Sequence, residues 1–68
     1  MKGWTRIYST PKGYLAEIIK GMLGSNNIES VIINKQDSNY LLGFYEIYVP
    51  QQHALYATNI VEREVETQ

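Results

Sequence analysis

Hydrophobic and polar positions recur along the chain with two different periods, and the changes of period mark its secondary structure. Residues 4–10, WTRIYST, are rich in aromatic, Ile and Thr side chains and stop before Pro11, which is typical of a β-strand. We expect a helix to follow, with Thr10 as its cap and Pro11 at its first position, or with a start two or three residues later. Its apolar stripe repeats every three or four positions and comprises Leu15, Ile18, Ile19, Met22 and Leu23. Gly21 indicates close packing within this helix, since glycine there costs about 1 kcal/mol relative to alanine.

The rest of the chain predicts two more strands and a second helix. The sequence GSNN ends the first helix, and Asn27 suits the left-handed backbone conformation that terminates many helices. Strands are expected over 28–34 and 44–49, joined by the polar loop 35–43. A helix should cover 51–64, and the residues expected to face inward from it are Ala54, Ala57, Ile60 and Val61.

This order of elements, β-α-β-β-α, matches the first five elements of the ferredoxin-like βαββαβ unit. The right-handed crossover makes the first and second strands parallel and places the third antiparallel between them, in the order 1-3-2. Both helices then cover the same face of a three-stranded sheet. The segment VETQ is too short and too acidic for a sixth element. We therefore expect one α+β domain over residues 1–68, with an ordered core at 4–61 and an acidic tail at 62–68.

Charged residues inside the strands indicate which face of the sheet is free of helices. Glu46 should point away from the core, and residues two positions away share its face. Arg6 gives the same indication in the first strand, and it could pair with Glu46 across the adjacent strands. The open face, our main candidate binding surface, then carries Trp4, Arg6, Tyr8, Phe44, Glu46 and Tyr48. From the second strand, either Val31 and Ile33 or Ile32 would join the open face. In the third strand, the side chains expected to face the helices are those of Tyr45, Ile47 and Val49.

An open face of this kind is too apolar to be left in water, because contiguous exposed patches beyond a few hundred Å² usually mark interaction sites. Three interpretations stay open. In the first, the strand facing is misassigned or loop 35–43 folds over the patch. In the second, the open face or an exposed edge strand forms a homodimer or larger oligomer. In the third, the face binds a ligand or a protein partner. Oligomerisation is a common source of stability for domains below roughly 80 residues, and this chain has 68.

Loop 35–43 is a second candidate region. Its polar residues offer donors and acceptors for a small ligand, although a solvated hairpin loop is the favoured explanation; they are Lys35, Asp37, Ser38 and Asn39. Asp37, Ser38 and His53 supply the residue types of a catalytic triad, but nothing orients the histidine. Turn chemistry accounts for the other two. The sequence therefore predicts no enzyme.

Composition limits the remaining chemistry. The chain has no cysteine and one histidine, which argues against disulfides and a zinc site. It has no glycine-rich phosphate loop either, so we expect neither a metal nor a cofactor. Six basic and seven acidic residues give a net charge of −1, which provides no general attraction to nucleic acid or anionic lipid. A nucleic-acid-binding module that stacks bases on the aromatic open face is nevertheless the alternative function.

The chain also lacks the sequence marks of membrane insertion or export. No apolar run reaches the ~18 residues of a membrane span. The first ten residues contain no continuous apolar segment of the kind found in signal peptides. The expected location is the cytoplasm.

Motifs in four parts of the chain point to a known family. They are RIYST, YLAEIIKGML, NNIESVIINKQDS and EIYVPQQHALYA, which lie within residues 4–61. In these motifs the chain resembles a short prokaryotic domain of unknown function whose members are described as "putative prokaryotic signal-transducing proteins". It departs from the family at Asn27, where glycine is preferred, and in QQH, which replaces a more acidic helix start. The resemblance implies a ferredoxin-like domain likened to PII-type regulators, with no catalytic residues.

Taken together, these features predict a non-catalytic regulatory or interaction module of bacteria that binds a protein partner or a small ligand. The signal-transducing role is what the resemblance implies. The non-catalytic character and the binding surface follow from the residues themselves.

Overall fold

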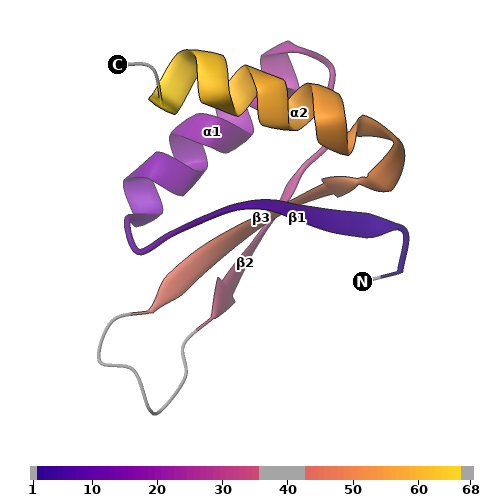
Figure 1. Ribbon diagram of the computed structural model, residues 1–68. Coiled ribbons are helices and arrows are strands. Elements are labelled where there is room, and N and C mark those ends of the chain that lie inside the picture. The colour runs from indigo at the N-terminus through magenta and orange to yellow at the C-terminus, as the bar shows by residue number, and fades with distance from the viewer. Residues whose placement is uncertain (1, 36–42, 67–68) are drawn as a thin grey trace.

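The computed structural model describes residues 2–35 and 43–66. Its principal elements are β1 (Trp4–Thr10), α1 (Gly13–Ser25), β2 (Val31–Lys35), β3 (Phe44–Pro50) and α2 (Ala54–Val61). A 3-10 turn (Gln51–His53) leads into α2, and a π-helical turn (Glu62–Glu66) continues it. The strands form one antiparallel sheet in the order β1-β3-β2, with both helices on one side of it (Figure 1). The expected α+β fold, its strand order and its one-sided helical layer are confirmed.

α1 starts at Gly13, two residues after Pro11, which is the later of the two starts expected from the sequence, and Thr10 is not its cap. Lys12 occupies the N-cap position and makes no capping bond through its side chain. The hydroxyl Oγ1 of Thr10 instead accepts a hydrogen bond of 3.1 Å from the backbone N–H of Lys12. Thr10 is therefore a buried turn residue at the end of β1, and the helix begins after Pro11 rather than on it.

The end of α1 is a Schellman motif centred on Asn27. This residue has φ 63°, the left-handed conformation expected from the sequence. The N–H of Ile28 donates to the carbonyl of Leu23 at 2.9 Å, and the N–H of Asn27 donates to that of Gly24 at 3.0 Å. Leu23 and Ile28 are both buried, so the turn that satisfies the last helical carbonyls also brings two core side chains together.

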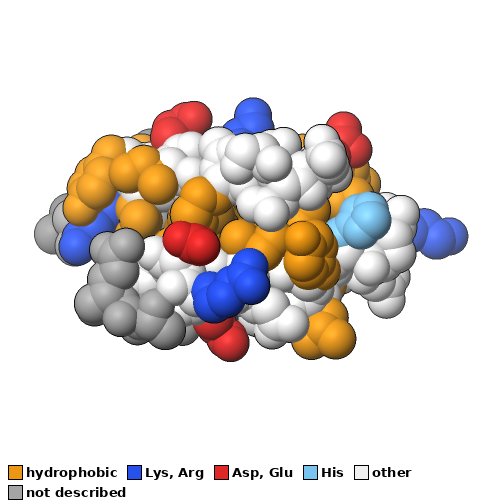
Figure 2. Space-filling view, turned by 90° about the horizontal axis from the view of Figure 1, so that it is seen from above, with side chains coloured by type: hydrophobic (Ala, Val, Ile, Leu, Met, Phe, Trp, Pro, Cys, Tyr) orange, Lys and Arg blue, Asp and Glu red, His pale blue; other side chains and the backbone are white. Residues whose placement is uncertain are grey.

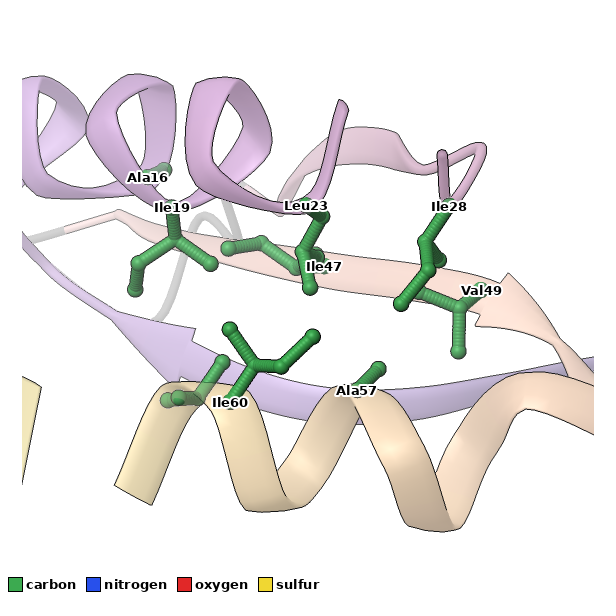
Figure 3. Packing of buried hydrophobic residues seen from close by; sticks show 9 residues of the cluster. Ala16, Ile19, Leu23, Ile28, Ile47, Val49, Ala57 and Ile60 are labelled. Carbon is green, nitrogen blue, oxygen red and sulfur yellow. The ribbon is translucent and has the colours of Figure 1, made fainter. Parts of the chain in front are cut away.

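The hydrophobic core lies between the sheet and the two helices (Figure 3). It contains nine buried residues: Ala16, Ile19, Leu23, Ile28, Ile47, Val49, Ala57, Ile60 and Val61. The inward-facing residues expected of the second helix are confirmed, since Ala54 packs against this cluster as well. Val65, in the π-helical turn after α2, also packs against this cluster.

Two expectations for α1 are wrong. Ile18 is 54% exposed, because the buried stripe of the helix is narrower than its apolar stripe and runs through Ala16, Ile19 and Leu23. Gly21 is not a site of close packing, since a Cβ atom there would meet nothing within 4 Å. Close approach is found at Gly13, where a Cβ atom would lie 3.2 Å from the ring of Tyr45.

The helical layer has its own exposed apolar residues. Seen from the helical side, hydrophobic side chains reach the surface between charged ones (Figure 2). The large apolar residues exposed on α1 and α2 are Tyr14, Ile18, Leu55 and Tyr56. Within residues 2–35 and 43–66, no helix has the length and apolar character needed to cross a membrane.

Candidate functional site

The pairing of β2 with β3 decides which residues of β2 lie on the open face. Val31 is opposite Tyr48, and Ile33 is opposite Glu46. Residues directly opposite each other in an antiparallel pair point to the same side of the sheet. Val31 and Ile33 therefore join the open face. Ile32, opposite Ile47, packs against the core instead.

A β-bulge in β1 changes the facing of the first strand. Arg6 is opposite Tyr48, but Tyr8 is opposite Ile47, so Ile7 is an extra residue with no counterpart on β3. The extra residue shifts the alternation by one position. Tyr8 consequently lies on the helical side and packs against the core, and its predicted place on the open face is wrong. Ser9 takes the place opposite Glu46.

The open face contains residues of all three strands. It consists of Trp4, Arg6, Ser9, Val31, Ile33, Lys35, Phe44, Glu46, Tyr48 and Pro50. Its large apolar side chains are half-buried, except for Phe44, which is 39% exposed. Neighbouring side chains therefore shelter part of the patch, although the helices lie on the opposite side of the sheet (Figure 1).

A hydrogen-bonded cluster occupies the middle of the open face. Nη1 of Arg6 donates to Oε2 of Glu46 at 2.8 Å, which confirms the cross-strand pair expected from the sequence. The hydroxyl of Tyr48 donates to Oε1 of the same carboxylate at 3.0 Å. Each oxygen of Glu46 thus accepts a hydrogen bond from a different neighbour.

These contacts keep Glu46 in its charged form. The hydrogen bond from Arg6 lowers the pKa of Glu46, with smaller contributions from the Tyr48 hydroxyl and the charge of Lys35, and it outweighs the opposing effect of burial. The same hydrogen bonds raise the pKa of Arg6 and that of Tyr48. The cluster is therefore a stable arrangement of a carboxylate, a guanidinium and a neutral phenol at neutral pH.

The cations of this face are better exposed than its carboxylate. The side chain of Arg6 is 57% exposed, whereas that of Glu46 is 12% exposed. Lys35, at the end of β2, is exposed as well. A molecule approaching the open face meets two positive charges and an apolar surface, with the negative charge screened beneath. This arrangement suits an anionic group attached to an apolar or aromatic body.

The other sequence-based candidates are only partly described. Lys35 belongs to β2 and the open face, whereas Asp37, Ser38 and Asn39 lie outside the described residues, as does any cover that loop 35–43 would provide. His53 ends the 3-10 turn before α2 and is half-buried.

Sequence reasoning missed the role of Lys35 and the exchange of Tyr8 for Ser9. Strict alternation along β2 would have placed Lys35 beside Ile33, because it is two residues further along the strand. The bulge had no such signal, since WTRIYST contains no glycine or other residue that marks one.

Comparison with known proteins gave one match. The family model described as "Putative prokaryotic signal transducing protein" matches residues 4–64. Searches among curated proteins and among solved structures gave no match. The match spans every strand and helix, from Trp4 at the start of β1 to the π-helical turn after α2.

Proposed function

We propose a function for this chain, which belongs to the family of "putative prokaryotic signal transducing proteins". It is a non-catalytic module that acts by binding a protein partner or a small ligand on its open face. The proposal rests on the Arg6–Glu46–Tyr48 cluster, which is set among apolar side chains on the side of the sheet opposite α1 and α2. A bacterial cytoplasm is the setting that we propose for it.

The state of Glu46 supports a binding role over a catalytic one. An effective general base has a pKa near the working pH. Glu46 has a lowered pKa, and both of its oxygens already accept hydrogen bonds. Its chemistry is that of a fixed charge that holds Arg6 and Tyr48 in place.

The size of the open face limits what can bind there. Strands about 4.8 Å apart with a rise of about 3.3 Å per residue give a three-stranded sheet of this length a footprint of roughly 300 Å². This is a projected backbone area, and the side chains of the face add accessible area to it. A small anionic ligand or a short segment of a partner fits this footprint.

The replacement Tyr48→Asp tests whether the open face mediates self-association. It places a second carboxylate beside Glu46 and removes an aromatic ring, so we expect weaker self-association while the helical circular dichroism stays the same. The control Tyr48→Phe keeps the ring and loses only the hydroxyl donor to Glu46. We expect it to associate like the wild type. Sedimentation equilibrium from low micromolar to millimolar concentration measures both.

Equal association constants for the wild type and Tyr48→Asp would count against a dimer through this face. They would leave a ligand or a different protein as its occupant.

The alternative function is binding of single-stranded nucleic acid. Trp4, Phe44 and Tyr48 lie on one face with two cations, which resembles the arrangement that stacks bases in RNA-binding sheets. Two phosphate contacts give weak, salt-sensitive affinity, so this function has less support. Trp4 is the single tryptophan and reports on it directly. Its fluorescence should be quenched by single-stranded RNA at low salt if this alternative holds, and unchanged if the open face binds other ligands.

A further inference from the structure

The outer edge of β1 has no neighbouring strand in the described part of the chain. The strand order β1-β3-β2 makes β1 an edge strand, with the unpaired N–H and C=O groups that such an edge presents. β2 is the other edge, but it has five residues and ends in Lys35, two features that discourage strand pairing. β1 has seven residues and contains neither Lys nor Pro. Its one charge, Arg6, points to the open face.

The helical layer extends beyond this edge. α1 contacts all three strands, whereas α2 packs mainly on β1 and also contacts β3. Packed helices have axes about 8–10 Å apart, while neighbouring strands are about 4.8 Å apart. α1 and α2 side by side are therefore wider than the two strands β3 and β1 beneath them, and their outer flanks extend beyond these strands. The outer flank of α1 has β2 beneath it, and the outer flank of α2 has no described strand beneath it; Figure 3 shows β1 behind α2.

A second copy of the chain cannot use this space by simple edge pairing. Antiparallel pairing of two β1 strands about a two-fold axis puts both α2 helices on the same side of the joint sheet. With the strands about 4.8 Å apart, the axes of two helices that each lie over β1 would be about 5 Å apart or closer. Packed helices need about 8–10 Å. The space admits one strand that carries no helix above it.

The bulge in β1 favours a flexible occupant. The extra residue, Ile7, bends the strand and increases its twist. The rigid edge of another sheet does not follow such a bend, whereas an isolated extended segment adapts to it.

We propose that the outer edge of β1 binds one extended segment of a partner protein, antiparallel to β1, as a fourth strand under α2. Its side chains alternate between apolar residues that face α2 and polar residues on the open face, with an acidic one beside the exposed guanidinium of Arg6. This inference goes beyond the proposed function, because it places a partner on the edge of β1 rather than on the open face. It specifies that partner as a short segment of alternating apolar and acidic residues.

A tethered segment tests this edge without knowledge of the natural partner. The π-helical turn after α2 ends on the side of the molecule where β1 ends and α1 begins (Figure 1). A segment of seven alternating Val and Glu residues, joined to the C-terminus by a flexible Gly/Ser linker, would therefore enter beside β1 in the antiparallel direction. Tethering raises its effective concentration to the millimolar range.

We expect the tethered segment to raise Tm by about 5 °C, the shift that roughly 1 kcal/mol gives in a domain of this size. Amide hydrogen exchange in β1 should slow. One matched control has the same composition with Val and Glu grouped in pairs, so that the alternation is lost. A second replaces alternate residues of the segment by proline, which removes the donors that a strand needs. Neither control should change Tm.

The same three chains give the results that would overturn the inference. An unchanged Tm and unchanged exchange in β1 with the alternating segment would do so, and so would an equal rise with the paired or proline segment. A second experiment separates binding at the edge of β1 from binding on the open face. Tyr48→Asp, introduced into the tethered chain, leaves the rise in Tm intact if β1 is a distinct docking edge, whatever that variant does to binding on the open face.

Discussion

Glu46 is the residue on which the geometry of the open face depends. Its carboxylate accepts hydrogen bonds from Arg6 and Tyr48 and holds both side chains above the sheet. The hydrogen bond to Glu46 fixes the orientation in which the Arg6 guanidinium faces a ligand. The carboxylate is therefore a positioning group for the cation.

The lowered pKa of Glu46 makes stability depend on pH in a defined direction. Glu46 binds a proton less readily in the folded state than in the unfolded state, where its carboxyl has the ordinary pKa of about 4.3. The stabilisation is therefore present above that value and is lost as the pH falls through the lower pKa of the folded state. We expect the stability difference between the wild type and Glu46→Gln to shrink on acidification. Urea unfolding at neutral pH and at successively lower pH values measures it, and a difference independent of pH would contradict the role of the Arg6 contact.

At the scale of residues, the sequence predicted the pair but not every member of the face. Arg6 and Glu46 could be paired because a charge inside a strand has to avoid the core. Tyr8 could not be placed, since a single extra residue in β1 reverses the facing of everything after it and WTRIYST carries no mark of the bulge.

Within α1, two glycines of the same helix have different surroundings. Gly21 is exposed and has space for a Cβ atom, whereas a Cβ atom added at Gly13 would lie 3.2 Å from the ring of Tyr45. We expect Gly21→Ala to stabilise the domain by about 0.5–1 kcal/mol, because alanine restricts the unfolded chain and favours the helix. Tm should rise by roughly 4–8 °C per kcal/mol.

Gly13→Ala is the matched control for that change. A Cβ atom at 3.2 Å from Tyr45 forces the ring to move, so the gain should be smaller or reversed. Thermal unfolding followed by circular dichroism compares the two variants. Equal Tm shifts would show that the contact with Tyr45 has no energetic consequence.

At the scale of elements, periodicity was a good guide to which segments are helices and strands and a poorer guide to their ends. The left-handed conformation of Asn27 could be predicted because Asn tolerates it and the apolar stripe stops just before it. The start of α1 was predicted only as one of two alternatives, because the sequence does not show that Thr10 uses its hydroxyl to stabilise the preceding turn instead of the helix. Ile18 fits the apolar period but lies outside the narrower strip that the sheet covers.

At the scale of the whole molecule, strand order followed from the element order and the handedness of the crossover. The position of α2 over β1 could not be predicted in this way, since it depends on how the two helices are distributed over the three strands. That position separates two surfaces. One is the open face with its cations, and the other is the edge of β1 beneath the flank of α2.

The proposed function requires that small anionic ligands bind to the open face and not to the helical layer. Anilinonaphthalene sulfonate, an anionic aromatic molecule, tests it because it matches the cations and apolar side chains of that face. We predict saturable, salt-sensitive binding to the folded protein. The affinity should fall by about tenfold, equivalent to about 1.4 kcal/mol, in Phe44→Asp and stay the same in Leu55→Asp, which changes a 77% exposed residue of α2. Absence of saturable binding, or binding that Leu55→Asp abolishes and Phe44→Asp leaves intact, would contradict the account.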